Sequence, residues 1–126
     1  MPDAQPLRAR RGRTADLAGR LAEEGVLRHY RARGATLLEA RWRGRGGEID
    51  LILRDGADLV FVEVKAARDH DAAAQALGPA QMRRIMLSAL DYCEARALGE
   101  VPMRFDVALV DATGRVALMP DAFGAG

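Results

Sequence analysis

The chain has 126 residues, a length that fits one domain with a modest hydrophobic core. Its 29% charged and 49% hydrophobic residues are ordinary for a globular protein, and its longest apolar runs are long enough only for a strand. This argues against a membrane-spanning helix or a membrane partner. The single cysteine, Cys93, cannot form an internal disulfide, so we expect a cytoplasmic protein.

The net charge of +1 hides an uneven distribution. Residues 1–47 carry 11 arginines against 5 acidic residues, whereas residues 48–126 carry 8 basic residues against 13 acidic ones. An arginine-rich half beside an acid-rich half suits a protein that binds a polyanion near a metal site. Taken alone, the charge distribution is explained more simply by a solvated surface. Lys65 is the only lysine among 19 basic residues and stands within an apolar strand pattern, which favours a chemical role for it.

The N-terminal part of the chain divides into an arm and a helix. Residues 1–13 are rich in Pro and Arg without periodicity, which predicts a flexible basic arm, and residues 14–126 are expected to form a single domain. Thr14 is expected to cap a helix over about residues 15–33, because apolar residues recur there every four positions. Glu23 lies at the edge of this apolar stripe.

The remaining elements follow in chain order. Three strands are predicted over residues 36–43, 48–53 and 59–65, with a hairpin turn over residues 54–58. A helical turn or loop (72–77), a helix (79–97) and two more strands (103–110 and 115–119) complete the chain. The apolar face of the second long helix is expected to comprise Met82, Ile85, Met86, Ala89, Leu90 and Cys93. The order αβββαββ predicts a mixed sheet flanked by helices.

Two carboxylates and a lysine should meet on the central hairpin. A turn centred near Gly56 sets Asp50 opposite Glu63, with Cβ atoms about 5 Å apart, and Lys65 projects from the same face as Glu63. Paired carboxylates are hard oxygen ligands that suit Mg²⁺ or Mn²⁺, and a lysine beside the ion can stabilise charge on a phosphate. A same-face ion pair between Glu63 and Lys65 is an equally good interpretation of these two residues alone.

Four blocks of the sequence resemble the YraN-like family of bacterial proteins, which is similar to Holliday-junction resolvases of the restriction-endonuclease-like superfamily. The blocks are residues 19–23 (Gly-x-x-Ala-Glu), 45–52 (Arg-Gly-Gly-Glu-Ile-Asp-Leu-Ile), 59–65 (Leu-Val-Phe-Val-Glu-Val-Lys) and 104–107 (Arg-Phe-Asp-Val). The resemblance covers about residues 15–123. It implies an α/β fold of the restriction-endonuclease-like type.

The resemblance also implies an active site. Its catalytic residues would be Glu23, Asp50, Glu63 and Lys65, with the three acids as ligands of Mg²⁺ or Mn²⁺. The chain departs from the family pattern at Ala67, where an Arg is frequent, and at Gln81, where a Lys is frequent. Neither departure removes a metal ligand, but both change the expected contacts with phosphate.

A nucleic-acid contact surface is expected beside this site. Arg41, Arg43 and Arg45 alternate along one strand, and together with Gln81 they are candidates for backbone contacts. A charged, exposed strand edge that resists aggregation explains the arginines equally well. Residues 44–47 (Gly-Arg-Gly-Gly) lack the Lys-Ser/Thr of a phosphate-binding loop and predict a turn with close backbone approach.

These observations lead to one principal hypothesis and two alternatives. The principal hypothesis is a Mg²⁺- or Mn²⁺-dependent endodeoxyribonuclease that hydrolyses phosphodiesters in branched or structured DNA, rather than RNA, and that can act as a homodimer. The first alternative is a non-catalytic nucleic-acid-binding module that retains the nuclease fold. The second is a protein-interaction adaptor in which the acids form structural ion pairs.

Overall fold

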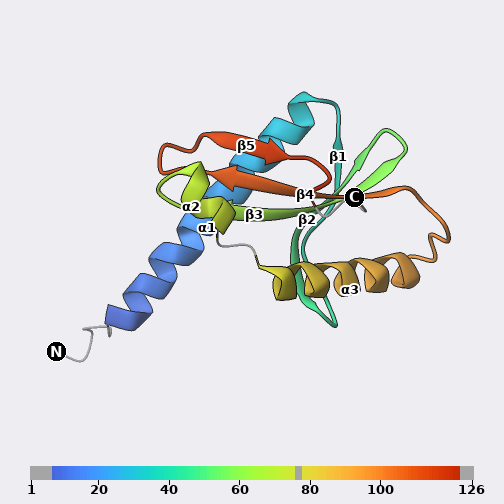
Figure 1. Ribbon diagram of the computed structural model, residues 1–126, viewed down its shortest axis with the longest axis horizontal. Coiled ribbons are helices and arrows are strands. Elements are labelled where there is room, and N and C mark those ends of the chain that lie inside the picture. The colour runs from blue at the N-terminus through green and yellow to red at the C-terminus, as the bar shows by residue number, and fades with distance from the viewer. Residues whose placement is uncertain (1–6, 76–77, 123–126) are drawn as a thin grey trace.

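The computed structural model, which describes residues 7–75 and 78–122, has one sheet between two layers of helices (Figure 1). The predicted α/β class and order are confirmed, with one short helix, α2, where a helical turn or loop was expected. The elements are α1 (Leu7–Ala32), β1 (Thr36–Gly44), β2 (Gly47–Asp55), β3 (Asp58–Ala66), α2 (His70–Gln75), α3 (Pro79–Ala95), β4 (Met103–Val110) and β5 (Val116–Met119). The arrangement is consistent with a restriction-endonuclease-like fold.

Helix α1 is longer than the sequence pattern predicted. It begins at Leu7, so residues 7–13 are helical where an irregular arm was expected, and Thr14 lies inside the helix. Arg, Leu and Ala are strong helix formers, so propensity extends the helix without an apolar stripe. Residues 1–6 of the predicted arm lie outside the described residues. The helix ends as expected before Gly34, whose φ of 92° is a conformation that favours glycine.

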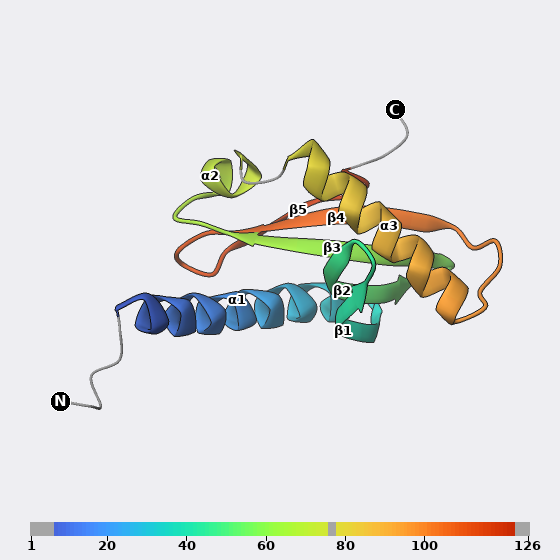
Figure 2. The ribbon, with the colours of Figure 1, turned by 90° about the horizontal axis from the view of Figure 1, so that it is seen from below.

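The sheet has the strand order β1-β2-β3-β4-β5. All neighbouring pairs are antiparallel except β3 and β4, which are parallel and are connected through α2 and α3. In Figure 2, α1 runs along one face of the sheet while α2 and α3 lie on the other. Strand β3 is therefore covered on both faces, and its residues 59–63 are all buried.

The two faces of the sheet form separate hydrophobic clusters. Ala22, Val26 and Tyr30 of α1 pack against strand residues such as Leu51 and Val62. On the other face, α3 packs against a second set, which contains Ile52, Leu59, Phe61, Ala89 and Tyr92. Alternate residues of β3 thus contribute to opposite clusters, as the alternation of side chains along a strand requires. The same alternation places Glu63 on the face of β3 that α3 covers.

The buried face of α3 differs from the predicted one. Ile85, Ser88, Ala89 and Tyr92 are buried, whereas Met86 and Leu90 are 44% and 56% exposed. The predicted face was correct for Ile85 and Ala89 and wrong for Met86 and Leu90. The reason is that the tip of the β1–β2 hairpin covers α3 beside Ser88, which rotates the contact surface toward a polar residue.

Among residues 7–75 and 78–122, no helix combines the length and the apolar character needed to cross a bilayer.

Candidate metal and phosphodiester site

Asp50 lies where strand β2 separates from strand β3. The register places residues whose numbers sum to 113 opposite each other, as the turn predicted, and the pairing runs from Asp55 with Asp58 to Leu51 with Val62. One step further along β2, the Asp50 carboxylate accepts a hydrogen bond from the backbone N–H of Val64 at 2.8 Å. A side chain thus replaces the backbone partner at the end of the ladder, and this holds the carboxylate between the two strands.

Glu63 is the buried member of the acidic pair, with a relative exposure of 7%. Its carboxyl lies close enough to that of Asp50 for the two groups to interact electrostatically, and the side-chain Nε2 of Gln81 donates to its Oε2 at 3.3 Å. Gln81 belongs to the first turn of α3, so the N-terminal end of this helix contacts Glu63. The structure therefore brings Asp50 and Glu63 together, as the hairpin register predicted.

The environment of Glu63 favours its neutral form. Burial and the adjacent negative charge of Asp50 raise the pKa of Glu63 to about 9, against the smaller lowering effects of Lys65 and Gln81. At neutral pH and without a cation, the Glu63 carboxyl consequently keeps its proton. When two carboxyl groups are held this close, a multivalent cation can take the place of that proton and relieve the repulsion between the two carboxylates.

Lys65 lies two residues beyond Glu63 on the same face of β3 and is half-buried. Its ammonium acts on Glu63 electrostatically and lowers the pKa of that carboxyl. The backbone of Lys65 pairs with Leu109 of β4, so the residue lies on a strand rather than on a loop. The lysine is thus positioned by a rigid element close to the acidic pair.

Glu23 is paired with an arginine rather than with the other two acids. Its Oε1 accepts a hydrogen bond from Nε of Arg41 at 2.9 Å, which ties α1 to β1. Burial raises the pKa of Glu23, Arg41 opposes this, and the negative charges of Asp50 and Glu48 add to it. Glu23 is therefore within electrostatic range of Asp50 but is neutralised by an arginine.

The three predicted metal ligands do not form one cluster. Within the described part of the chain, no group of three or more His, Cys, Asp or Glu side chains is arranged to hold a metal ion. The structure brings together Asp50 and Glu63, with Lys65 beside them, and leaves Glu23 bound to Arg41. The fourfold convergence expected from the sequence is thus only partly present.

Arg41 has an unusual backbone conformation for a strand residue. Its φ is 54°, although the register on both sides of it is regular, with Ala40 opposite Leu51 and Trp42 opposite Ile49. A left-handed conformation costs a residue with a Cβ about 1–2 kcal/mol. Strain of this kind persists where surrounding structure requires it, and here the strained residue carries the guanidinium that binds Glu23.

The other predicted nucleic-acid contacts have different environments. Arg43 is exposed on β1, whereas Arg45 binds the carboxylate of Asp91 on α3 through Nε and through its backbone N–H, both at 2.7 Å. Trp42, which precedes Arg43, packs edge-on against Tyr92 with ring centroids 5.3 Å apart. Gln81 is directed toward Glu63. Of these residues, Arg43 and the exposed part of Arg45 face solvent on the hairpin that carries Asp50.

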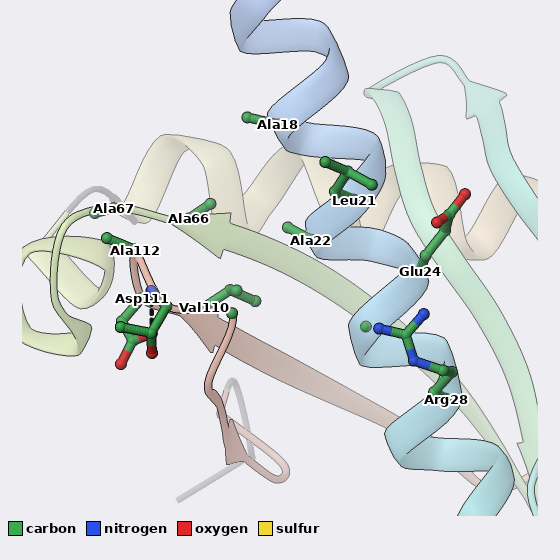
Figure 3. Close-up of a pocket in the computed structure, with 13 residues that line it drawn as sticks. Ala18, Leu21, Ala22, Glu24, Arg28, Ala66, Ala67, Val110, Asp111 and Ala112 are labelled. Carbon is green, nitrogen blue, oxygen red and sulfur yellow. Dashed lines mark hydrogen bonds between the residues drawn. The ribbon is translucent and has the colours of Figure 1, made fainter.

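Two cavities flank α1. The larger, about 590 Å³, lies between α1 and the β4–β5 turn, and its lining includes several alanines together with Leu21, Glu24 and Arg28 (Figure 3). The smaller, about 330 Å³, lies on the opposite side of α1 and is lined by Arg20, Glu23, Arg41 and Leu51 among others. Of these two cavities, only the smaller is lined by predicted site residues, namely Glu23 and Arg41.

A second acidic residue with a distinctive environment is Asp106 on β4. It is buried, and it accepts hydrogen bonds from Tyr30 Oη at 2.6 Å, from Arg104 Nε at 3.0 Å and from the backbone N–H of Asp121 at 2.9 Å. The pairing of Arg104 with Asp106 is visible in their two-residue spacing, but the contact with Tyr30 joins residues 76 positions apart and has no local signal. Through these hydrogen bonds Asp106 joins α1 and the segment after β5 to β4, which is a structural role.

The model of the uncharacterised protein family UPF0102 matches residues 22–110. The chain belongs to this family. The YraN-like resemblance inferred from the sequence motifs is thereby confirmed. The matched region contains Glu23, Asp50, Glu63 and Lys65, so the acidic pair and its neighbours lie within the part that the UPF0102 model covers.

UPF0102 proteins from other bacteria are similar to this chain over nearly its full length. The UPF0102 protein of Ruegeria pomeroyi is 52% identical over 119 residues, which are 94% of this chain and 97% of the relative. That of Ruegeria sp. strain TM1040 is 49% identical over 92% of this chain and 94% of its own length. That of Cereibacter sphaeroides strain ATCC 17025 is 45% identical over 90% of this chain and 98% of its own.

Proposed function

We propose that this UPF0102 protein is a divalent-metal-dependent endonuclease that hydrolyses phosphodiesters in branched or structured DNA. The observation that carries the proposal is the pair of neighbouring, interacting carboxyl groups of Asp50 and Glu63 at the point where β2 and β3 separate, with Lys65 on the same face. Two carboxylates and a fixed cation are the side chains that metal-assisted phosphodiester hydrolysis requires.

The donor set fits Mg²⁺ or Mn²⁺. Both ions prefer oxygen ligands and bind through one or two carboxylates, with water and substrate phosphate completing their coordination. Asp50 is fixed by the N–H of Val64, and Glu63 is held by Gln81, so both carboxyl groups have defined orientations before an ion arrives. The proton that Glu63 keeps at neutral pH is the charge that a bound cation would replace.

The roles of the residues follow from their positions. Asp50 and Glu63 would hold the ion, and when bound, the ion would acidify a water molecule and withdraw negative charge from the scissile phosphate. Lys65 lies two residues beyond Glu63 on the same face of a rigid strand, and its positive charge would stabilise the charge that develops on the phosphate in the transition state. Glu23 would complete the ligand set directly or through water.

The exposed arginines next to the site suit a nucleic-acid backbone. Arg43 and the solvent-exposed side chain of Arg45 lie on the hairpin that carries Asp50, and the side chain of Arg45 is 67% exposed. Guanidinium groups bind phosphate oxygens through paired N–H donors. We propose DNA as the partner, with a homodimer as the form that would cut two strands of a junction.

One experiment tests this function directly. Purified protein is incubated with labelled four-way junction, flap, duplex and single-stranded DNA, with and without Mn²⁺, beside the variant Asp50→Asn. We expect cleavage that needs Mn²⁺, prefers a branched substrate and is abolished in Asp50→Asn, whose far-UV circular dichroism remains that of the wild type. Full activity of Asp50→Asn would refute the assignment.

The ion pair of Glu23 with Arg41 favours a second candidate, a nucleic-acid-binding module without catalysis. A protein in which the third acid is neutralised by arginine keeps the basic surface but holds fewer free carboxylates for an ion. Such a module would bind DNA in a salt-sensitive manner without a divalent metal, and Asp50→Asn would not weaken that binding. The same set of incubations, followed by binding assays at two salt concentrations, separates the two functions.

A further inference from the structure

Arg41 of β1 has a strained backbone conformation, and its side chain forms an ion pair with Glu23 of α1. Its φ of 54° is rare for any residue with a Cβ, and glycine would adopt it freely. The guanidinium bridges from β1 to Glu23 on α1, at 2.9 Å, with side-chain exposures of 32% and 17%. Glycine would relieve the strain but could not form this ion pair between β1 and α1, so the ion pair is the feature that the strained arginine provides.

The pair lies beside the acidic site rather than at a distance from it. The register of β1 with β2 places Arg41 opposite Asp50, and the negative charge of Asp50 acts on Glu23. Both Glu23 and Arg41 line the cavity of about 330 Å³ between α1 and the sheet. Arg20 lines the same cavity. A cation bound to Asp50 would attract Glu23 and repel Arg41, since both act across a partly desolvated space.

We propose that Arg41 is the exchange partner of Glu23. It holds the Glu23 carboxylate in the metal-free protein, releases it to a divalent cation at Asp50 and Glu63, and then binds a backbone phosphate of the nucleic acid. This inference rests on the proposed function. The exchange conserves charge, because the carboxylate changes one cationic partner for another and the arginine changes one anionic partner for another.

The structure offers the surroundings that such an exchange needs. The cavity beside Arg41 gives the guanidinium room to move, and Arg20 adds a second positive charge to the lining of the same cavity. Binding of the metal and of the nucleic acid are then coupled, because each ligand favours the arrangement that the other requires. In this way, metal would enhance DNA binding through Arg41.

The test measures Mn²⁺ binding by electron paramagnetic resonance, without any turnover. Arg41→Gln removes the competing cation, so we expect Mn²⁺ to bind about 5-fold more tightly or better, the lower end of coupling between sites. Arg54→Gln removes the same charge from an exposed position of β2 and should leave the affinity unchanged. In a Glu23→Gln background, Arg41→Gln should have no effect, because the carboxylate for which Arg41 competes is absent.

A second measurement tests the phosphate contact. Binding of a four-way junction with hydrolysis-resistant phosphorothioate linkages is followed against salt, with and without Mn²⁺. Arg41→Gln should reduce the salt slope by about one charge with Mn²⁺ and leave it unchanged without the ion. Arg41→Gly, which relieves the positive φ, should behave as Arg41→Gln does and controls for misfolding.

The outcomes separate this inference from the proposed function. If wild-type protein cleaves DNA with Mn²⁺ and Asp50→Asn does not, but Arg41→Gln binds Mn²⁺ no more tightly than the wild type, the exchange is overturned and the nuclease stands. A gain in affinity that persists in the Glu23→Gln background also overturns the exchange. If wild-type protein neither binds Mn²⁺ nor cleaves DNA, both the exchange and the proposed function are wrong.

Discussion

The hydroxyl of Ser88 on α3 donates a hydrogen bond to the carbonyl oxygen of Gly47 at 2.9 Å, and this contact fastens the β1–β2 hairpin to the helix. Beside it, a Cβ at Gly46 would come within 2.0 Å of the carbonyl oxygen of Arg84. The hairpin backbone thus lies directly on α3. Asp50 follows three residues after Gly47, so the position of this carboxylate depends on how the hairpin is seated.

We therefore predict that Gly46→Ala both destabilises the protein and weakens Mn²⁺ binding. The added methyl group meets backbone rather than a flexible side chain, so the hairpin must lift from α3, at a cost of about 1–3 kcal/mol. Urea unfolding gives the change in stability, and electron paramagnetic resonance gives the Mn²⁺ affinity.

Gly19→Ala is the matched control for that substitution. A Cβ at Gly19, on α1, has nothing within 4 Å, so alanine should stabilise the protein by about 0.5–1 kcal/mol through its greater helix propensity. Mn²⁺ affinity should not change. A Gly46→Ala variant as stable as the wild type would show that the hairpin does not need close contact with α3.

The pKa of Glu63 predicts the pH dependence of stability. The folded protein holds this proton up to about pH 9, whereas an unfolded chain releases it near the ordinary value of 4.5. Between these values the folded state binds more protons, so the free energy of unfolding of the metal-free protein should fall as pH rises, by at most about 1.4 kcal/mol per pH unit. Thermal melts in chelator across this range measure the slope.

Two additions to those melts identify the group responsible. Glu63→Gln cannot ionise, so its stability should vary less with pH and should exceed that of the wild type at pH 8. Mn²⁺ should stabilise the wild type more at pH 8 than at pH 5, because at lower pH it competes with the proton of Glu63. A Glu63→Gln variant with the slope of the wild type would assign the pH dependence to other residues.

Much of this architecture follows from local patterns, and the exceptions have physical causes. The alternation along residues 48–53 and 59–65 predicted the strands, and the turn at Gly56 predicted their register and the closeness of Asp50 to Glu63, because a tight hairpin fixes which residues face each other. The start of α1 at Leu7 was not predicted, since helix propensity can extend a helix where the sequence shows no apolar stripe.

Contacts between distant elements could not be predicted from spacing. The ion pair of Glu23 with Arg41 joins α1 to β1, and the bond from Tyr30 to Asp106 joins α1 to β4; each depends on how a helix is placed on the sheet. The glycines at 44–47 did indicate a close backbone approach, which the contact of Gly46 with Arg84 confirms, but not which element would approach. The partners of side chains in different layers depend on how the layers pack together, which residue spacing along the chain does not specify.

Tyr30→Phe tests the structural role of Asp106. The substitution removes the buried hydroxyl that donates to Asp106 at 2.6 Å, and a hydrogen bond to a charged group contributes about 1.5–3 kcal/mol. We expect a loss of stability of this size in urea unfolding at pH 7. Mn²⁺ affinity should stay at the wild-type value, because Asp106 is bound to protein groups. Weaker Mn²⁺ binding in Tyr30→Phe would place Asp106 among the residues that support the metal site.

Lys65→Met tests whether the lone lysine acts in catalysis or in an ion pair with Glu63. If its charge stabilises the transition state, the rate of DNA cleavage should fall by about 100-fold or more while Mn²⁺ still binds. Lys65→Arg should not restore the rate, because a planar guanidinium cannot occupy the position of a compact ammonium on a half-buried strand. Arg68→Met removes an arginine whose side chain is 87% exposed, three residues further along, and should cleave DNA at nearly the wild-type rate. If Lys65→Met instead kept the full rate and lost only stability, the lysine would be a structural partner of Glu63, and the charge that neutralises the scissile phosphate would have to come from the ion or from the arginines of β1.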